Sequence, residues 1–371
     1  MIQRFVFATP AMLCIAMFAC SSNGSPSAAT TPTSPPPTSP ATPMSDDEFK
    51  AQITTSMQTT LLVELQTLNK AAMDIQSAAP TTTGRGWDAV QDAQAITAMK
   101  DAWRRARISY EHIEGAVAPL FPDVDAAIDA RYDDFLAQLA SVGGDQDLFD
   151  DQGVTGMHAV ERILYVDTTP ANVVDFEKVL PGYKAAARPA TEQEAADFKN
   201  KLCARLVADT KTLVDQWTPA KIDIATAYAG LVALMNEQRE KVNKAATGEE
   251  ESRYSQLTLA DIHGNLDGTR TVYAIFQPWI LAKGGAAQDT AIQTGFDALQ
   301  AAYDANTGDA IPQPPPTWSA EQPSAADLMS PFGKLYTSVR AAADPNVPTS
   351  IVSEMSSAAD LLGFKRFKST P

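Results

Sequence analysis

The segment Gly153-Val-Thr-Gly-Met-His-Ala-Val-Glu-Arg-Ile-Leu-Tyr165 decides how the rest of the sequence is interpreted. A turn that contains glycine is followed by apolar residues such as Val160 and Leu164, whose spacing predicts a helix. His158 and Glu161 are three residues apart, so both side chains project from one face of that helix. An imidazole and a carboxylate placed in this way can bind one metal ion together. The pair is also explained by a core or capping histidine beside a surface glutamate, because short motifs often match by chance.

Composition and charge narrow the fold class and the partners. Hydrophobic residues make up 44% of the 371 residues and aromatic residues only 8%. This composition favours helices over strands and is sufficient for a large buried core. The net charge of −16 would repel the phosphates of nucleic acids, so we expect no nucleic-acid partner. An acidic surface is compatible with bound cations and equally with simple solubility.

The first 44 residues are typical of an exported protein that is held on a membrane. Residues 1–20 have the charged start and the apolar stretch of a lipoprotein signal peptide, and Ala19 precedes Cys20, the expected site of lipidation. Ordinary signal cleavage nearby is the alternative, because Phe18 occupies a position that is usually small. Residues 21–44 are uncharged and rich in Pro, Ser and Thr, which predicts an extended tether. We therefore expect a location in the bacterial cell envelope, facing the periplasm or the cell surface.

Residues 45–368 are expected to form the folded domain, which shows no strand-like alternation. Ser45-Asp-Asp-Glu48 and Thr191-Glu-Gln-Glu194 are capping boxes at the start of helices. We predict an all-α fold of long antiparallel helices in one or two packed four-helix-type bundles, with sub-bundles at about 45–190 and 191–368. About ten helices are expected, near residues 45–78, 87–118, 124–142, 154–165, 191–217, 219–246, 257–282, 287–303, 325–343 and 350–367. Cys203 is the only cysteine after residue 20, so no disulfide framework is available.

Two more segments carry acidic side chains that could share a metal ion with the histidine motif. Glu111 and Glu114 form another i, i+3 pair in the second predicted helix, although neighbouring arginines would also explain them as a solvated charged face. Asp129 lies in an aspartate-rich run, where it could instead pair with Arg131. Metal sites in helical bundles are built from inward carboxylates on one helix and a Glu/His pair on another. A set of this kind suits iron, manganese or zinc.

These segments resemble the imelysin-like family, in its EfeO/EfeM branch. His158-Ala-Val-Glu161 corresponds to the HxxE motif of the family. Three other segments are similar to family segments and follow the same order: Tyr110-Glu-His-Ile-Glu114, the run from Phe121 to Arg131, and Glu249–Gly268, which is similar to the branch's GEE-x-YSHTDL-x-DF-x-AN-x-x-G segment. The resemblance extends across roughly residues 50–365.

The resemblance implies an extracytoplasmic, all-helical protein that captures ferrous or ferric iron, or another divalent transition metal such as zinc, for uptake. The lipid anchor would hold the protein on a membrane, and an iron permease or a peroxidase-type protein would be its partner. The metal ligands that the resemblance implies are His158, Glu161, Glu111, Glu114, Asp129 and, on a weaker match, Glu237.

The sequence departs from the family pattern at several points. The cupredoxin-like domain of longer EfeO proteins is replaced by the predicted tether, as in the shorter EfeM-type lipoproteins. Gln256 or Leu257 stands where the branch has the histidine of YSHTDL, and His112 stands where an arginine is usual. His263 lies near the first of these departures, where a core or surface histidine would also be ordinary.

Two other functions remain open on the sequence alone. Imelysin relatives have been classed as metallopeptidases, and in an HxxE metallopeptidase Glu111 or Glu114 would have to act as the general base. A surface protein that binds glycans or mediates adhesion would instead need exposed Trp and Tyr side chains near the carboxylates.

Overall fold

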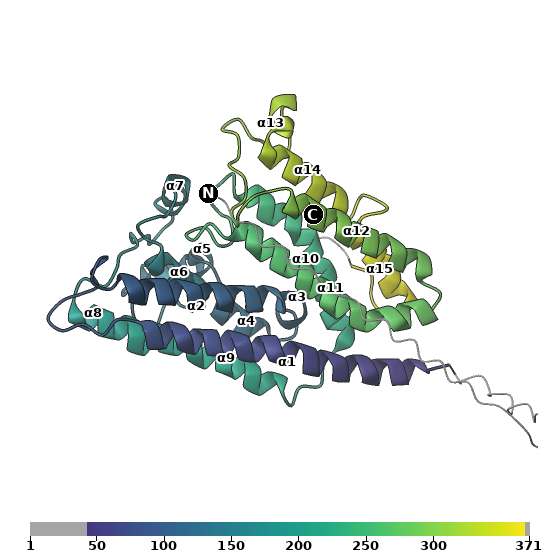
Figure 1. Ribbon diagram of the computed structural model, residues 1–371, viewed down its shortest axis with the longest axis horizontal. Helices are drawn as coiled ribbons and strands as arrows, with labels where there is room; N and C mark the ends of the chain where they lie inside the picture. Colours follow the sequence, from purple (N-terminus) through teal and green to yellow (C-terminus); the bar gives the residue numbers. More distant parts are fainter. Residues whose placement is uncertain (1–42, 368–371) are drawn as a thin grey trace, which may run out of the picture. The chain divides into compact units, whose positions relative to one another are not determined.

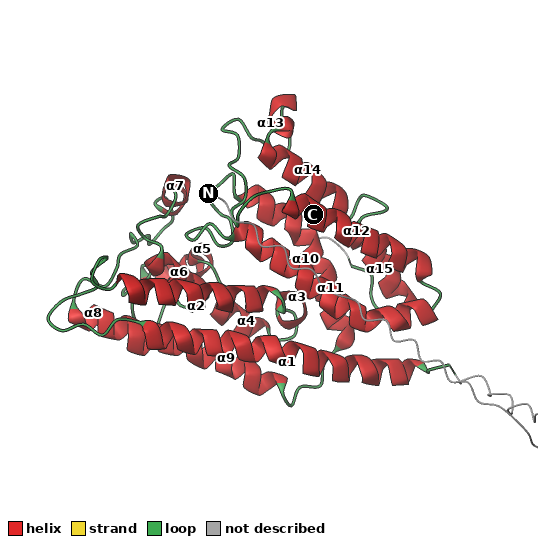
Figure 2. Ribbon diagram, viewed as in Figure 1, coloured by secondary structure: helices red, strands yellow, loops and turns green. Residues whose placement is uncertain are grey.

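The computed structural model describes residues 43–367, in which all regular structure is helical (Figure 1, Figure 2). This confirms the all-α fold class. The predicted signal peptide, Cys20 and nearly all of the tether lie outside the described residues. Of the described residues, 44–367 belong to one compact unit. Its helices are α1 (Asp46–Ala78), α2 (Ala93–Glu111), α3 (Glu114–Val117), α4 (Pro122–Asp129), α5 (Tyr132–Leu139), α6 (Gly156–Leu164), α7 (Ala171–Glu177), α8 (Glu192–Asp197), α9 (Cys203–Trp217), α10 (Ile224–Lys244), α11 (Thr258–Ala282), α12 (Ala286–Asp304), α13 (Ala325–Met329), α14 (Pro331–Ala343) and α15 (Ile351–Leu361).

Two groups of helices share one hydrophobic core. α1 packs against α2 and α9, and the three run side by side in the lower part of Figure 1. α10, α11, α12, α14 and α15 pack on one another and cross the same view obliquely. α10 also packs on α3, and α11 packs on α1 and α2. Helices from before and after residue 190 therefore contribute to a single cluster of buried apolar side chains.

Local sequence explains how α1 begins and which side it buries. The Ser45 side chain accepts a hydrogen bond from the Glu48 backbone, and the Glu48 side chain binds the Ser45 backbone in return. This capping box satisfies backbone N–H groups that have no partner within the helix. Ile53, Met57 and Leu61 then recur every four residues and are fully buried, so one side of α1 faces the core.

Two of the predicted helices are interrupted in the structure. The helix expected at 87–118 starts only at Ala93 and ends at Glu111, and a separate turn of helix, α3, follows at Glu114. The helix expected at 124–142 is divided at Ala130–Arg131, where Ala130 leaves the helical conformation and Arg131 is extended, between α4 and α5. Both interruptions lie where polar side chains gather, and neither contains the glycine or proline that usually marks a helix end.

Smaller differences concern the loops and the C-terminal helices. α7 lies in a stretch predicted as loop, and the helix expected to start near Pro219 begins after Asp223, whose side chain caps α10. A π-helical turn at Phe198–Leu202 separates α8 from α9. Ser330 and Pro331 divide the helix expected at 325–343 into α13 and α14. Pro278 lies inside α11 without ending it.

Two glycines bring together the helices that carry the polar side chains. A Cβ atom on Gly268 of α11 would lie 2.2 Å from the backbone oxygen of His112, so only glycine permits this approach to the end of α2. Gly156 starts α6 with a φ of +83°, and a Cβ atom there would lie 2.7 Å from the backbone oxygen of Ile128. α11 is thus held against α2, and α6 against α4.

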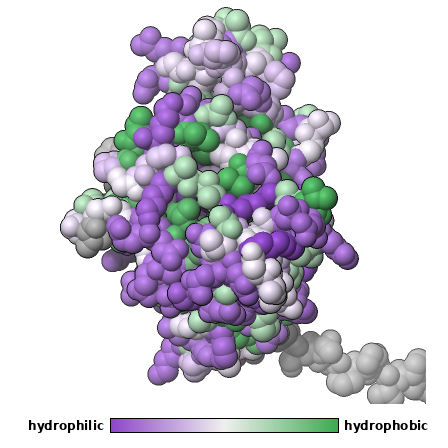
Figure 3. All heavy atoms as spheres, turned by 90° about the vertical axis from the view of Figure 1, so that its left-hand side faces the viewer, coloured by the Kyte–Doolittle hydropathy of each residue, from purple (hydrophilic) through white to green (hydrophobic). Residues whose placement is uncertain are grey.

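The surface of the described region is mixed in character. The face shown in Figure 3 is mostly hydrophilic, with hydrophobic side chains scattered between polar ones. Large exposed apolar residues such as Val90 and Val179 lie in different parts of the chain. Among residues 43–367, no helix combines the length and the apolar character that a membrane span requires.

Candidate metal centre

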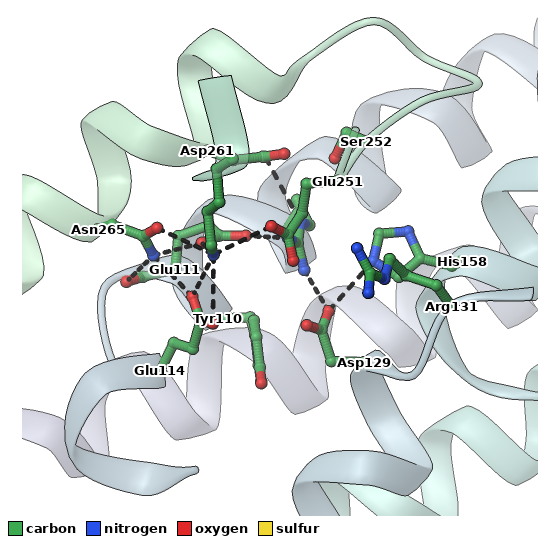
Figure 4. A network of polar contacts seen from close by, with 12 residues as sticks. Tyr110, Glu111, Glu114, Asp129, Arg131, His158, Glu251, Ser252, Asp261 and Asn265 are labelled. Carbon is green, nitrogen blue, oxygen red and sulfur yellow. Dashed lines mark hydrogen bonds and ion pairs between the residues drawn. The ribbon is translucent and has the colours of Figure 1, made fainter. Parts of the chain in front are cut away.

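Polar side chains from both helix groups converge in one network. They come from α2 (Arg107, Glu111), α3 (Glu114), α4 (Asp129), α6 (His158, Glu161), α10 (Lys241), the turn after α10 (Glu251) and α11 (Asp261, Asn265). Figure 4 shows Glu111, Glu114 and Asn265 on one side, Asp129 and His158 on the other, and Glu251 between them. The network therefore has two ends, which we call the His158 end and the Lys241 end.

At the His158 end, three side chains present ligand atoms to a common position. One atom from each of Asp129, His158 and Glu251 lies within 4.8 Å of the other two. His158 is only 2% exposed, and its Nε2 atom is 3.4 Å from Oδ1 of Asp129. Within the described residues this buried Nε2 forms no hydrogen bond. One imidazole and two carboxylates are donors that iron, zinc and manganese accept, so the residues present fit a transition metal ion.

Glu161 orients His158 and is itself held by the loop before α11. Its Oε2 atom is 2.8 Å from Nδ1 of His158. Its Oε1 atom accepts hydrogen bonds from the backbone N–H groups of Tyr254 and Ser255, at 3.2 and 2.8 Å, and from Oγ of Ser255 at 2.7 Å. Both carboxylate oxygens are therefore occupied by protein groups. A carboxylate on the far nitrogen of an imidazole fixes the ring and leaves the other nitrogen free to bind metal.

Arg107 lies in the middle of the network with a side chain only 1% exposed. Its guanidinium forms ion pairs with Glu111 and Asp129, and with Glu251 at 3.3 Å and Asp261 at 3.4 Å. A buried carboxylate is stable only when it is paired and hydrogen-bonded. Arg107 therefore provides a fixed positive charge that allows several carboxylates to be buried close together.

Lys241 provides the second buried cation, at the opposite end. Its Nζ atom lies 3.1 Å from Glu114 and 3.1 Å from Glu251, and 3.9 Å from Glu111. It also donates a hydrogen bond to Oδ1 of Asn265 at 3.1 Å. Glu251 is thus shared, because it contacts Lys241 and Arg107 and also belongs to the three-residue group at the His158 end.

A cavity of about 600 Å³ reaches the network from outside. Its lining includes Asp129 and Glu251 from the His158 end and Glu114 and Lys241 from the other. Seven carboxylates and three cationic side chains line it: Glu114, Asp125, Asp129, Asp134, Glu237, Glu240 and Glu251, with Arg131, Lys241 and Lys244. This surplus of negative charge attracts cations to the entrance.

The charges in the network alter several pKa values. Burial alone would lower the pKa of His158, but the carboxylates of Asp129 and Glu161 outweigh it and raise that pKa to about 9. Burial, together with the charge of Asp129, raises the pKa of Asp125 to about 7. Burial would raise the pKa of Glu251, but Lys241 and Arg107 outweigh it and hold that pKa well below its usual range. Glu251 is therefore an ionised ligand candidate, whereas His158 must lose a proton before it can bind a metal ion.

The structure separates the six residues that the sequence indicated as ligands. Asp129 and His158 lie together, with Glu161 directly behind the imidazole. The remaining three do not reach this position: Glu111 and Glu114 lie at the Lys241 end, and Glu237 lines the cavity without forming an ion pair within the described residues.

Five members of the network were not recognised in the sequence: Glu251, Asp261, Asn265, Arg107 and Lys241. Asp261 and Asn265 lie within Glu249–Gly268, the segment that is similar to the family. Glu251 belongs to the run Glu249-Glu-Glu251, whose similarity to the GEE segment was the available signal. Arg107 was interpreted as one of the arginines of a solvated charged face. Lys241 had no comparable signal, since isolated basic residues on helices are usually solvated. The other two histidines lie elsewhere: Nδ1 of His112 is 3.2 Å from Glu64, and Nε2 of His263 is 3.9 Å from Asp304.

Known proteins resemble this chain over most of the described region. The iron uptake system component EfeM of Pseudomonas syringae pv. syringae is 26% identical over 217 residues, which cover 58% of this chain and 60% of that protein. The iron uptake system component EfeO of Yersinia pseudotuberculosis is 28% identical over 191 residues, which cover 52% of this chain and 40% of that protein. The chain thus matches less than two thirds of the length of either relative.

A solved structure and a family model extend the match. The crystal structure of an imelysin-like protein from Psychrobacter arcticum aligns with a TM-score of 0.54 and 12% sequence identity, covering 88% of this chain and 99% of that one. At this identity the likeness concerns the fold. The sequence model of the imelysin family matches residues 55–326, which include the HxxE segment and the glutamate run of Glu251. Because that match covers well over half of the chain, the protein belongs to the imelysin family.

Proposed function

We propose that this protein captures a transition metal ion, with iron as its physiological cargo, as a component of an iron-uptake system. The observation that carries the proposal is the convergence of Asp129, His158 and Glu251 beside a cavity lined by acidic side chains. The printed names of the EfeM and EfeO relatives support iron as the cargo. Asp129, His158 and Glu251 would hold the ion, and Glu161 would orient the imidazole.

The expected location follows from the first 44 residues. In this proposal lipidated Cys20 anchors the protein, and residues 21–44 tether the folded domain to a membrane of the cell envelope. The domain would then pass its ion to an iron permease or a peroxidase-type partner. No chemical step is required of the protein beyond binding and releasing the ion.

The other two functions have less support in the structure. A metallopeptidase would need a carboxylate that is free to activate water, but Glu111 is fully buried against Arg107 and Glu114 is paired with Lys241. A glycan-binding or adhesive surface would need exposed aromatic side chains. Trp103, Trp217 and Trp279 are instead buried in the core.

Calorimetric titration of the full-length protein with Fe²⁺ under anaerobic conditions, and separately with Zn²⁺, tests the proposal. We expect one ion per chain, and a loss of affinity of more than about 100-fold in His158→Ala, since even residues that only orient a ligand contribute about 10- to 100-fold. His263→Ala is the matched control, because His263 lies outside the network. Unchanged stoichiometry and affinity in a folded His158→Ala protein would contradict the proposed site.

A further inference from the structure

The ammonium group of Lys241 has the surroundings of a bound cation. Carboxylate oxygens of Glu114 and Glu251 each lie 3.1 Å from Nζ, and the nearest oxygen of Glu111 lies 3.9 Å away. The amide oxygen of Asn265 completes the set at 3.1 Å. These four oxygen donors come from α2, α3, the turn after α10 and α11, so residues distant in the sequence form a cage around one positive charge.

The side chains of this cage are held in place by burial and by hydrogen bonds to one another, so the cage is not a flexible surface contact. Lys241 is only 6% exposed, and Asn265 and Glu111 are fully buried. Asn265 also donates a hydrogen bond to Glu114 at 2.7 Å, and its own oxygen accepts one from Gln238 at 3.1 Å. The oxygens would therefore keep much of their arrangement if a different cation took the place of the ammonium group.

Glu251 connects the cage to the His158 end. The carboxylate contacts Lys241 through Oε2 and Arg107 through Oε1, and it supplies one of the three atoms grouped with Asp129 and His158. Glu111 and Glu114, by contrast, have no contact with His158. The cation at the Lys241 end thus occupies Glu114 directly and contributes, with Arg107, to holding Glu111 away from a metal ion.

We propose that Lys241 acts as a tethered cation that fills a second cation position in the network and thereby restricts the protein to one metal ion. It is a specificity-determining residue for the site assigned above, and the inference rests on that proposed function. The ammonium group pairs with Glu114 and, together with Arg107, holds Glu111, and it thereby keeps both glutamates out of the ligand set. Without it, Glu111, Glu114, Glu251 and Asn265 would form a second site for a hard or intermediate cation, built from oxygen donors alone.

Substitution of Lys241 distinguishes this role from that of an ordinary buried ion pair. The full-length Lys241→Met protein is titrated with Zn²⁺, which has no redox chemistry, and its melting temperature is measured with and without the ion. We expect one Zn²⁺ per chain in the wild type and two in the variant, and a lower melting temperature in the metal-free variant that Zn²⁺ restores. Lys244→Met is the matched control, since Lys244 lines the same cavity but pairs with Glu240 at 2.8 Å. The Lys244→Met protein should still bind one ion. The Lys241→Arg protein should also bind one ion, because it keeps a positive charge at the same position.

A second variant tests the proposal even if Lys241→Met does not fold. Glu114→Gln in the otherwise natural protein should change Zn²⁺ affinity by less than about threefold, because Glu114 serves the lysine and not the metal. A 100-fold loss in Glu114→Gln would overturn the inference, as would one ion of unchanged affinity in folded Lys241→Met, or two ions in the wild type. If the wild type binds no Zn²⁺ but Lys241→Met binds one ion, Lys241 does fill a cation position, but the proposed function fails and with it the restriction to one ion. If neither the wild type nor Lys241→Met binds Zn²⁺, both the inference and the proposed function fail.

Discussion

At the His158 end of the network, Asp129 and Glu251 place carboxylate oxygens beside an imidazole nitrogen that has no hydrogen bond within the described residues. At the Lys241 end, Glu111, Glu114 and Glu251 surround an ammonium group that already occupies the position between them. Each end is largely buried, has two carboxylates of its own and shares the carboxylate of Glu251. The comparison shows that carboxylates at helical spacing do not by themselves define a metal site. What differs is whether the protein has already supplied the cation.

The largest effect expected on this comparison comes from Glu161→Gln. Glu161 orients the imidazole through Nδ1, so its replacement should weaken metal binding by about 10- to 100-fold without changing the stoichiometry. The glutamine keeps a side-chain oxygen that can still accept hydrogen bonds from Tyr254 and Ser255. Calorimetric titration measures the affinity. A loss as large as that in His158→Ala would show that Glu161 is a direct ligand.

Glu177→Gln is the matched control for this variant. Glu177 is another buried glutamate, but it pairs with Arg162 at 3.1 Å and does not contact His158. Its replacement should lower stability and leave metal affinity unchanged. An equal loss of affinity in both variants would mean that Glu161 acts only through the general stability of the fold.

The pH dependence of metal affinity should show whether the ion binds at the His158 end of the network. The pKa of His158 is raised to about 9, so at neutral pH a metal ion has to displace a proton from it. We expect affinity to rise about tenfold per pH unit below pH 9, and one proton to be released per ion. Titrations in buffers of different ionisation enthalpy measure that release. Affinity that is independent of pH between 6 and 8 would contradict a role for His158 as a ligand.

The same raised pKa predicts how the metal-free protein responds to pH. A histidine whose folded-state pKa exceeds the unfolded value stabilises the fold fully below the unfolded pKa, near 6.5, and loses that contribution as the pH rises towards 9. The melting temperature of the metal-free protein should therefore fall across this window. Bound metal should reduce the fall, because it replaces the lost positive charge.

Substitution of the two glycines that position the helices should have a smaller effect on metal binding and should disturb one end of the network at a time. Gly156→Ala would force a Cβ atom to 2.7 Å from Ile128 and displace α6, whereas Gly268→Ala would force one to 2.2 Å from His112 and displace α11. Each should lower the free energy of unfolding by about 1–3 kcal/mol, as measured by urea denaturation. Only Gly156→Ala should also weaken metal binding, since α6 carries His158. The reverse result would place the metal at the Lys241 end.

Part of this site could be predicted from the sequence because it is local. His158 and Glu161 share one turn of α6, so their contact follows from helical spacing, and the imelysin-like resemblance and the all-α fold are confirmed. The break after Glu111 could not be predicted from nearby residues, because neither glycine nor proline lies at it, and its neighbour Gly268 belongs to a helix far along the chain. The role of Lys241 could not be predicted either, since nothing in α10 alone indicates that its ammonium group contacts glutamates from α2 and α3. The predicted set of ligands remains a prediction.

The smallest effect is expected from Glu237→Gln. Glu237 was implied as a ligand by resemblance, but it lines the cavity and forms no ion pair within the described residues. Burial raises its pKa to about 7, so near neutral pH part of the population is already neutral and less than a full charge is lost on substitution. Metal affinity should change by less than about threefold, because only the field at the cavity entrance is altered. Association should slow slightly, and more so at low ionic strength, which stopped-flow measurements at two salt concentrations would resolve. A loss of 10-fold or more in equilibrium affinity would instead make Glu237 part of the site and extend the metal position from the His158 end into the cavity.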